Sequence, residues 1–184
     1  MELWNFHQLP KECLQSVFWE LASVDPDVDP RFEKEEWFSS TLLEWGRCGK
    51  LLMEDGEALA FAEYAPATLF PRLAEFSAGR AGSPHACFLA YCFAEERHRR
   101  KGIGSALVRE VARDLVDRGF RSVEAIGDRA FDGGWVLPAG FLAANGFVVV
   151  AEDPRYPLMR LDLHGSAGAR RERAVAGAVP SAGD

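Results

Sequence analysis

The sequence predicts an α/β (α+β) fold in which one mixed sheet of about six to seven strands carries helices on both faces. An apolar segment at 86–93 leads through a glycine loop into an amphipathic stretch, which leads into a second apolar segment at 120–127. Such a strand–helix–strand crossover is right-handed and makes its two strands parallel. A hairpin pattern at 50–64 adds antiparallel neighbours, so both pairings are expected.

Two helices are expected before the first strand. Residues 11–22 carry apolar side chains at helical spacing, and so do residues 31–45. An acidic segment broken by two prolines, 25–30, separates them. The residues expected on the buried side of the second helix are Phe32, Trp37, Phe38, Leu42 and Trp45.

A β-hairpin is expected next, formed by residues 50–53 and 58–64. They flank a turn that contains Asp55 and Gly56, a pair that tolerates the positive φ such turns need. A connection rich in Pro, Ala and Gly follows at 65–84.

The strand at 86–93 has almost no polar residue, so both of its faces should be covered. The helix that follows, 105–118, carries apolar residues four apart and ends before Gly119, a natural C-cap. Opposite charges at i,i+4 are expected on its solvent side, pairing Asp114 with Arg118 and Arg113 with Asp117. The apolar residues expected on its buried side are Ile103, Leu107, Val111 and Leu115.

The C-terminal part predicts a short helix at 138–145, which Gly146 ends, and strands at 147–151 and 158–163. Residues 164–184 are mostly Ala, Gly, Ser and Arg, a composition typical of a flexible tail. We therefore expect one domain over 1–163 followed by a tail over 164–184.

Composition favours a reduced, cytoplasmic protein, as a monomer or homodimer. The formal net charge of −7 argues against general nucleic-acid binding, which needs many cations. Apolar runs fall short of the roughly 20 residues that a membrane span needs, and the N-terminus lacks signal-peptide features. The four cysteines show no CxxC spacing, so no metal site is expected.

The loop at 99–104 is typical of an anion site. Glycines let the backbone approach an anion, and the first N–H groups of the next helix lack internal partners. Leu107 stands where a dinucleotide fingerprint needs a third glycine, and the P-loop pattern is absent. A solvated basic turn is the alternative for these six residues considered alone.

In this context the chain resembles the GNAT superfamily of acyl-CoA-dependent N-acyltransferases. The resemblance spans about residues 1–163 and includes the order of elements and the (Arg/Gln)-x-x-Gly-x-(Gly/Ala) pattern of Arg99, Gly102 and Gly104. Residues 141–147 look like the family's Phe-Tyr-x-x-x-Gly-Phe ending, with Leu142 in place of tyrosine. We interpret the chain as an atypical, actinobacterial-type member.

The resemblance implies a donor site for acetyl-CoA or another acyl-CoA. Backbone amides from Arg99 to Ser105 would hold the pyrophosphate, and the end of the strand before this loop would pair with the pantetheine arm. The thioester would lie where this strand and the next one splay apart. The implied donor-binding residues are Cys92, Phe93, Ala94, Arg99, Arg100, Lys101, Gly102, Ile103, Gly104 and Ser105.

The usual acid of the family is missing, because Leu142 cannot donate a proton, and Trp135 stands where an asparagine often precedes the helix. Either the thiolate leaves unaided, or a tyrosine elsewhere supplies the proton. The tyrosines considered are Tyr64, Tyr91 and Tyr156.

The base that deprotonates the acceptor is sought among Glu63, Glu124 and Asp128. Glu124 interrupts an apolar strand, where a carboxylate is costly unless it is paired or hydrated. A salt bridge to a neighbouring arginine, such as Arg121 or Arg129, is the equal alternative for it. The catalytic candidates are Glu124, Glu63 and Tyr91.

The resemblance therefore implies acyl transfer to the primary amine of a small molecule by direct attack. The acidic loops at 25–29 and 152–153 would attract a cationic amine or simply aid solubility. The same fold could instead take its acyl group from an acyl carrier protein's phosphopantetheine. A non-catalytic acyl-CoA-binding regulatory domain is the second alternative. Nucleic-acid and membrane partners are not expected.

Overall fold

The computed structural model describes residues 3–23, 27–83 and 85–163. Within these residues, seven strands form one mixed sheet with the order β1-β2-β3-β4-β7-β6, and β5 pairs with β4. The strands are β1 Gly49–Glu54, β2 Glu57–Pro66, β3 Cys87–Ala94, β4 Ser122–Asp128, β5 Leu137–Pro138, β6 Val148–Ala151 and β7 Leu158–Asp162. The α-helices are α1 Lys11–Leu14, α2 Pro30–Glu44, α3 Ile103–Asp117 and α4 Ala139–Ala144.

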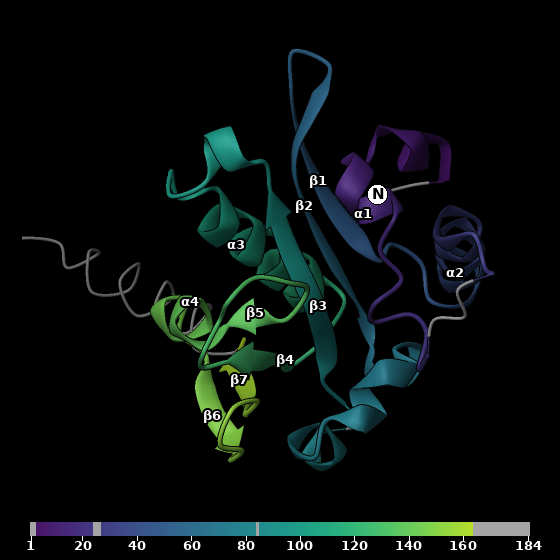
Figure 1. The fold of residues 1–184 in the computed structure, drawn as a ribbon. Helices are drawn as coiled ribbons and strands as arrows, with labels where there is room; N and C mark the ends of the chain where they lie inside the picture. Colours follow the sequence, from purple (N-terminus) through teal and green to yellow (C-terminus); the bar gives the residue numbers. More distant parts are fainter. Residues whose placement is uncertain (1–2, 24–26, 84, 164–184) are drawn as a thin grey trace, which may run out of the picture.

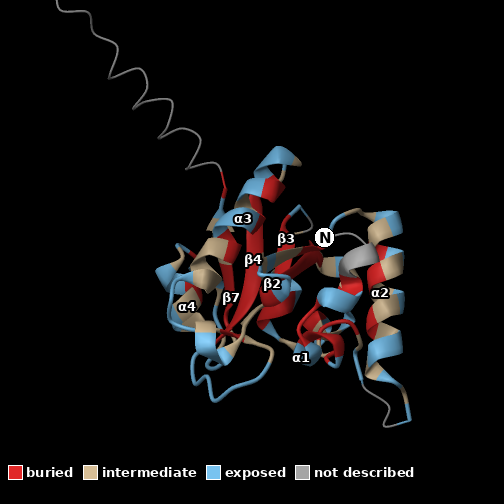
Figure 2. Cartoon of the chain, turned by 90° about the horizontal axis from the view of Figure 1, so that it is seen from above, coloured by how far each residue is buried: buried red, intermediate tan, exposed pale blue. Residues whose placement is uncertain are grey.

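Helices cover both faces of this sheet, as the sequence predicts (Figure 1). On one face, α1 and α2 bury an aromatic-rich core that includes Phe38, Phe61 and Phe88. On the other face, α3 and α4 bury a second core around Leu107 and Leu142. Figure 2 shows the buried strands between these two helical layers. The described residues between β2 and β3 contain three short 3-10 helices, η2 Ala67–Leu69, η3 Pro71–Glu75 and η4 Ala78–Ala81.

The hairpin and the central crossover form as expected. Asp55 and Gly56 both have positive φ, at 51° and 86°, in the turn between β1 and β2. Gly119 has φ +82° directly after α3, and β3 runs parallel to β4. The predicted tail, 164–184, lies outside the described residues.

The first predicted helix is wrong over most of its length, because α1 ends at Leu14. Val17 and Trp19 are both buried although they stand two residues apart. Residues two apart point to different sides of a helix, so a helix lying on the sheet could not bury both. Trp19 instead packs edge-on against Phe88, and its indole N–H donates to the Trp135 carbonyl at 2.9 Å.

The second helix forms, but the interpretation of its buried side needs correction. Phe32 is 65% exposed, whereas Lys34, Phe38 and Thr41 are buried. These three positions follow the i, i+4, i+7 spacing of one helix face. The buried side of α2 therefore contains a lysine that hydrophobic patterning could not indicate.

The expected ion pairs on α3 also change. Asp114 is buried rather than solvated, and it accepts hydrogen bonds from Tyr64 Oη at 2.8 Å and Lys50 Nζ at 3.0 Å. Arg118 Nη1 still lies 3.4 Å from Asp114 Oδ2. Arg113 pairs with Glu110 instead of Asp117. The Asp114 carboxylate thus joins α3 to the β1–β2 hairpin.

β3 and β4 separate after a short paired region, as the resemblance implies. Their register joins Cys87 to Val123 and Phe88 to Glu124, at the first half of each strand. The register between β2 and β3 shifts just beyond this point, where Glu63 pairs with Tyr91 and Tyr64 with Leu89. This bulge adds a residue to β3, and such a residue locally bends the strand that carries it. The second half of β3 stays paired with β2 but has no partner on its β4 edge among the described residues.

Candidate functional site

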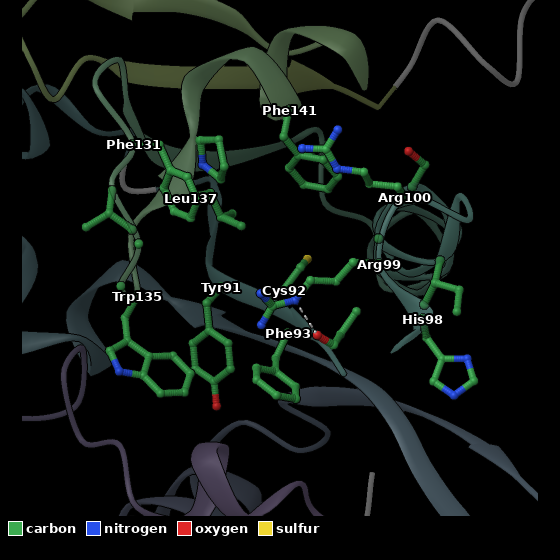
Figure 3. A pocket seen from close by; sticks show the side chains of 18 of the residues that line it. Tyr91, Cys92, Phe93, His98, Arg99, Arg100, Phe131, Trp135, Leu137 and Phe141 are labelled. Carbon is green, nitrogen blue, oxygen red and sulfur yellow. Dashed lines mark hydrogen bonds between the residues drawn. The ribbon is translucent and has the colours of Figure 1, made fainter. Parts of the chain in front are cut away.

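A cavity of about 850 Å³ lies beside the end of β3 that has no β4 partner among the described residues. The cavity is lined by residues at the end of β3, in the segment 98–102, in the first turn of α3, in the segment 131–138 and at the start of α4, and by Glu12 of α1. Figure 3 shows Arg100 and His98 on the α3 side of this cavity, and Trp135 and Tyr91 across from them. We call these two sides the basic end and the aromatic end.

The basic end is an open helix N-terminus. Gly102, at φ +80°, caps α3 without any side-chain hydrogen bond, and Arg100 also has positive φ, at 59°. The first N–H groups of α3 are therefore free to bind a ligand, and the helix dipole adds positive potential there. This backbone can hold an anion, with the His98, Arg99 and Arg100 side chains around it.

The predicted donor-binding residues come together here, since all of them except Lys101 line the cavity. Gly104 faces the Phe141 ring so closely that a Cβ atom would lie 3.0 Å from it. Arg99 Nε donates to the Ala94 carbonyl at 3.0 Å, which ties the loop to the end of β3 (Figure 3). Burial raises the pKa of the Cys92 thiol to about 12, so this cavity-lining thiol stays protonated at neutral pH.

The aromatic end is walled by three rings. The Trp135 ring meets Tyr91 edge-on with centroids 4.9 Å apart, and it stacks on Phe93 at 6.4 Å. Gly133 and Gly134, both with φ of +109°, bring the chain to Trp135. These rings present flat apolar surfaces to the cavity.

Glu63 and Tyr91 belong to a buried ionic cluster behind this wall. Lys34 Nζ lies 2.8 Å from Glu63 Oε2 and also pairs with Glu20. The Tyr91 hydroxyl donates to Glu63 Oε2 at 3.1 Å, so only its ring lines the cavity. Burial raises the pKa of Glu63 although Lys34 opposes the shift, and burial beside Glu63 raises the pKa of Tyr91. One oxygen each of Glu20 and Glu63 has no hydrogen-bond partner among the described residues.

Glu124 does not line the cavity. Its carboxylate accepts from Arg160 Nη2 at 2.5 Å and from the Ser83 N–H at 3.0 Å. Arg160 stands opposite Glu124 on β7, so strand register makes this pair. The salt-bridge alternative is therefore the arrangement found, but its partner is neither Arg121 nor Arg129. Asp128, the third candidate, pairs with Arg155.

The alternative acids lie away from the reacting region. The Tyr64 hydroxyl donates to Asp114, and Leu142, which stands in the place of the family's usual acid, is a fully buried residue of α4. Neither Tyr64 nor Tyr156 lines the cavity. Of the three tyrosines, only Tyr91 borders it, with its hydroxyl engaged by Glu63.

A family model described as "Acetyltransferase (GNAT) family" matches residues 8–131. This chain belongs to that family. The match covers the hairpin, β3, the glycine loop, α3 and β4, and so includes the β3 end and the α3 N-terminus that line the cavity, whereas the lining residues from Gly133 to Phe141 lie beyond it. The chain is thus a member of a family of N-acyltransferase enzymes, as its glycine loop indicates.

Solved structures share the GNAT fold. An N-acetyltransferase from Staphylococcus aureus Mu50 aligns with a TM-score of 0.57 and 16% identity, over 89% of this chain and 95% of that one. PaiA N-acetyltransferase from Thermoplasma acidophilum, in complex with coenzyme A, aligns with a TM-score of 0.54 and 15% identity, over 88% and 95%. Ard1 from Thermoplasma volcanium gives a TM-score of 0.52 and 16% identity, over 84% and 93%. No curated protein sequence matches the chain.

Some features of this GNAT domain were not predicted from its sequence. Glu12 lines the cavity from α1, and Phe131 and Val136 line it from the loop after β4. Glu12 follows Lys11 in a segment expected to be an ordinary amphipathic helix, and no local signal separates it from other surface glutamates. The only available hint for the loop was its composition, Phe131 and Trp135 around two glycines.

No helix in the described residues is long and apolar enough to cross a membrane. Across the same residues, no group of three or more His, Cys, Asp or Glu side chains is placed to hold a metal ion. The cytoplasmic location, the oligomeric state and the actinobacterial type stay predictions.

Proposed function

We propose that this GNAT domain transfers an acyl group, acetyl in the simplest case, from an acyl-CoA thioester to the primary amine of a small molecule by direct attack. The observation that supports this proposal is that a single cavity joins the anion-binding helix N-terminus to the aromatic rings. This cavity runs from the open N-terminus of α3 along the free end of β3 to the aromatic end. The coenzyme A in the PaiA structure supports a coenzyme A donor for this chain.

The residues present fit such a donor. The uncapped first turn of α3 and the Arg99 and Arg100 side chains offer N–H groups and positive charge to a pyrophosphate. The end of β3 offers backbone groups, because it has no β4 partner beyond Phe88 in the described sheet. An extended pantetheine arm can pair with this backbone as an added strand would.

The chain's own contribution to the chemistry is positioning and polarisation. A backbone N–H near Cys92 on the free end of β3 would donate to the thioester carbonyl and stabilise its oxyanion. The rings of the aromatic end would exclude water from the reacting carbon. Because thiols have a pKa near 8.5, the leaving group needs little acid help, and the absence of a tyrosine at Leu142 is compatible with transfer.

Acetyl-CoA binding with and without turnover tests this function. Isothermal titration should show binding, and a thiol assay with a panel of primary amines should show amine-dependent release of free coenzyme A. Binding without turnover of any amine would instead favour the regulatory domain. Turnover only with an acylated carrier protein would favour the carrier-dependent enzyme.

A charge reversal at Arg100 provides a site-specific check. Arg100→Glu should lower the affinity for acetyl-CoA about tenfold, on the order of 1.4 kcal/mol, because a cation beside the pyrophosphate becomes an anion. Added salt should shrink the difference between this variant and the wild type. Arg113→Glu makes the same charge change on an exposed position of α3 outside the cavity, and should leave the affinity unchanged. Equal affinities of the two variants would argue against the pyrophosphate assignment.

A further inference from the structure

The cavity has one carboxylate in its wall, that of Glu12. Among the described residues that line it, no other is acidic. Glu12 is exposed on α1, and within the described part of the chain its side chain makes no hydrogen bond or ion pair. A carboxylate in this position can receive a cation from solvent without first giving up a partner.

The other carboxylates near the cavity are already engaged. Glu63 is held by Lys34 and Tyr91, and Glu124 is held by Arg160. Taking a proton from an acceptor would force either residue to weaken a buried ion pair, which is costly. Glu12 has no such cost.

The two ends of the cavity differ in charge. His98, Arg99 and Arg100 lie around the basic end. Glu12 adds a negative charge on the other side of the cavity, where the remaining lining side chains outside β3 are apolar. Figure 3 shows Trp135 and Tyr91 across the cavity from Arg100. Glu12 belongs to the Tyr91 side, because its neighbour Cys13 forms a side-chain hydrogen bond with Tyr91. An ammonium group would be repelled at one end and attracted at the other.

The rings of the aromatic end indicate what the amine is attached to. Tyr91, Phe93 and Trp135 offer faces that attract a cation and edges that pack against an apolar group. Phe131, 46% exposed, adds a fourth ring from the loop after β4. This wall has few groups that could hydrogen-bond the hydroxyls of a polar amine.

We propose that Glu12 binds the ammonium group of the acceptor and takes its proton, and that the acceptor is a primary amine carried on an apolar, preferably aromatic, group. This inference rests on the acyl transfer proposed above. The Glu12 carboxylate removes one proton from the ammonium, and the freed lone pair forms the C–N bond with the thioester carbonyl. The C–S bond then breaks, and its electron pair leaves with sulfur. The second nitrogen proton passes to that sulfur, which gives the amide and the free thiol, and Glu12 returns its proton to solvent.

Glu12→Gln and Glu44→Gln form a matched pair for the test, because Glu44 is an exposed glutamate on α2 outside the cavity. Amine binding is measured by isothermal titration on protein saturated with coenzyme A, so no turnover is needed. The wild type should bind 2-phenylethylamine at least tenfold more tightly than ethanolamine. Glu12→Gln should weaken 2-phenylethylamine binding at least tenfold, and Glu44→Gln should leave it unchanged.

Kinetics test the proton step separately. At pH 7, Glu12→Gln should lower kcat/KM for 2-phenylethylamine by about 100-fold, a usual contribution of a general base. The loss should shrink as the pH approaches 10, where the amine is already neutral in solution. A substitution that only disturbed α1 would lower the rate equally at every pH.

Three results would overturn the inference. Unchanged amine binding in Glu12→Gln would show that Glu12 does not bind the ammonium group. Equal binding of ethanolamine and 2-phenylethylamine would show that the acceptor need not carry an apolar group. A loss of rate that is the same at every pH would show that Glu12 does not take the proton of the acceptor. If Glu12-dependent binding appeared but no amine reacted, the ammonium site would be supported, and both the proton step and the acyl transfer would fail.

Discussion

The basic and aromatic ends of the cavity are built in two different ways. The basic end lies within one contiguous run, 98–105, whose backbone amides at the start of one helix would bind the proposed donor. The aromatic end assembles Glu12, Tyr91 and Trp135 from three distant segments, with Lys34 buried behind them. The basic end depends on local backbone geometry, and the aromatic end depends on tertiary packing. Substitutions at the basic end should therefore weaken binding, whereas substitutions at the aromatic end should lower the stability of the fold.

The largest expected effect is a loss of stability at the aromatic end. Lys34→Met leaves the Glu20 and Glu63 carboxylates buried without their shared cation. Breaking a buried ion pair in this way costs about 3–5 kcal/mol. The free energy of unfolding, measured by urea titration, should fall by about that amount.

Two further variants sharpen this result. Lys11→Met, at an exposed lysine on α1, should change the free energy of unfolding by less than about 0.5 kcal/mol. Adding Glu20→Gln and Glu63→Gln to Lys34→Met should restore part of the loss, because two buried charges are then removed with their partner. A Lys34→Met protein as stable as the wild type would show that the cluster behind the aromatic end contributes little.

A substitution at the basic end should instead remove binding and leave most of the stability. Gly104→Trp places a large side chain in the cavity wall, where even a Cβ would meet Phe141 at 3.0 Å. We expect the affinity for acetyl-CoA to fall more than about 100-fold, equivalent to about 2.7 kcal/mol, while the far-UV circular dichroism stays native.

Gly140→Trp is the control for this variant, because Gly140 is exposed on α4, does not line the cavity and has no atom within 4 Å of an added Cβ. Its affinity for acetyl-CoA should match the wild type. If Gly104→Trp bound acetyl-CoA as tightly as Gly140→Trp, the basic end would not be the donor site.

The contrast between local geometry at the basic end and tertiary packing at the aromatic end also explains which features the sequence could predict. The hairpin turn at Asp55 and Gly56, and the glycine loop with Gly102 and Gly104, are set by local backbone needs that residue type reveals. The end of α1 was missed because it depends on where Trp19 finds a partner, the Trp135 carbonyl, over a hundred residues away.

Lys34 shows why the aromatic end was harder to predict. Lysine is almost never fully buried unless it is paired, so the hydrophobic pattern predicts Phe32, and not Lys34, on the buried side of α2. The reason for its burial lies in Glu20 and Glu63, which come from other segments of the chain. Glu12 was missed likewise, since nothing nearby in sequence shows that the fold brings it to a cavity that Tyr91 and Trp135 also line.

The smallest expected effect is a pH dependence of stability confined to the aromatic end. Burial raises the pKa of Glu63, so the folded state holds a proton there above the pH at which the unfolded state has lost it. This contribution to stability is fully present below the ordinary glutamate pKa, about 4.5, and is lost as the pH rises through the raised value. Glu63→Gln removes this titration, and its free energy of unfolding should fall less than that of the wild type as the pH rises above 4.5. The exposed Glu57→Gln should follow the wild-type curve. If the free energy of unfolding of all three proteins changed in parallel with pH, Glu63 would be ionised over the whole range, kept in that state by Lys34.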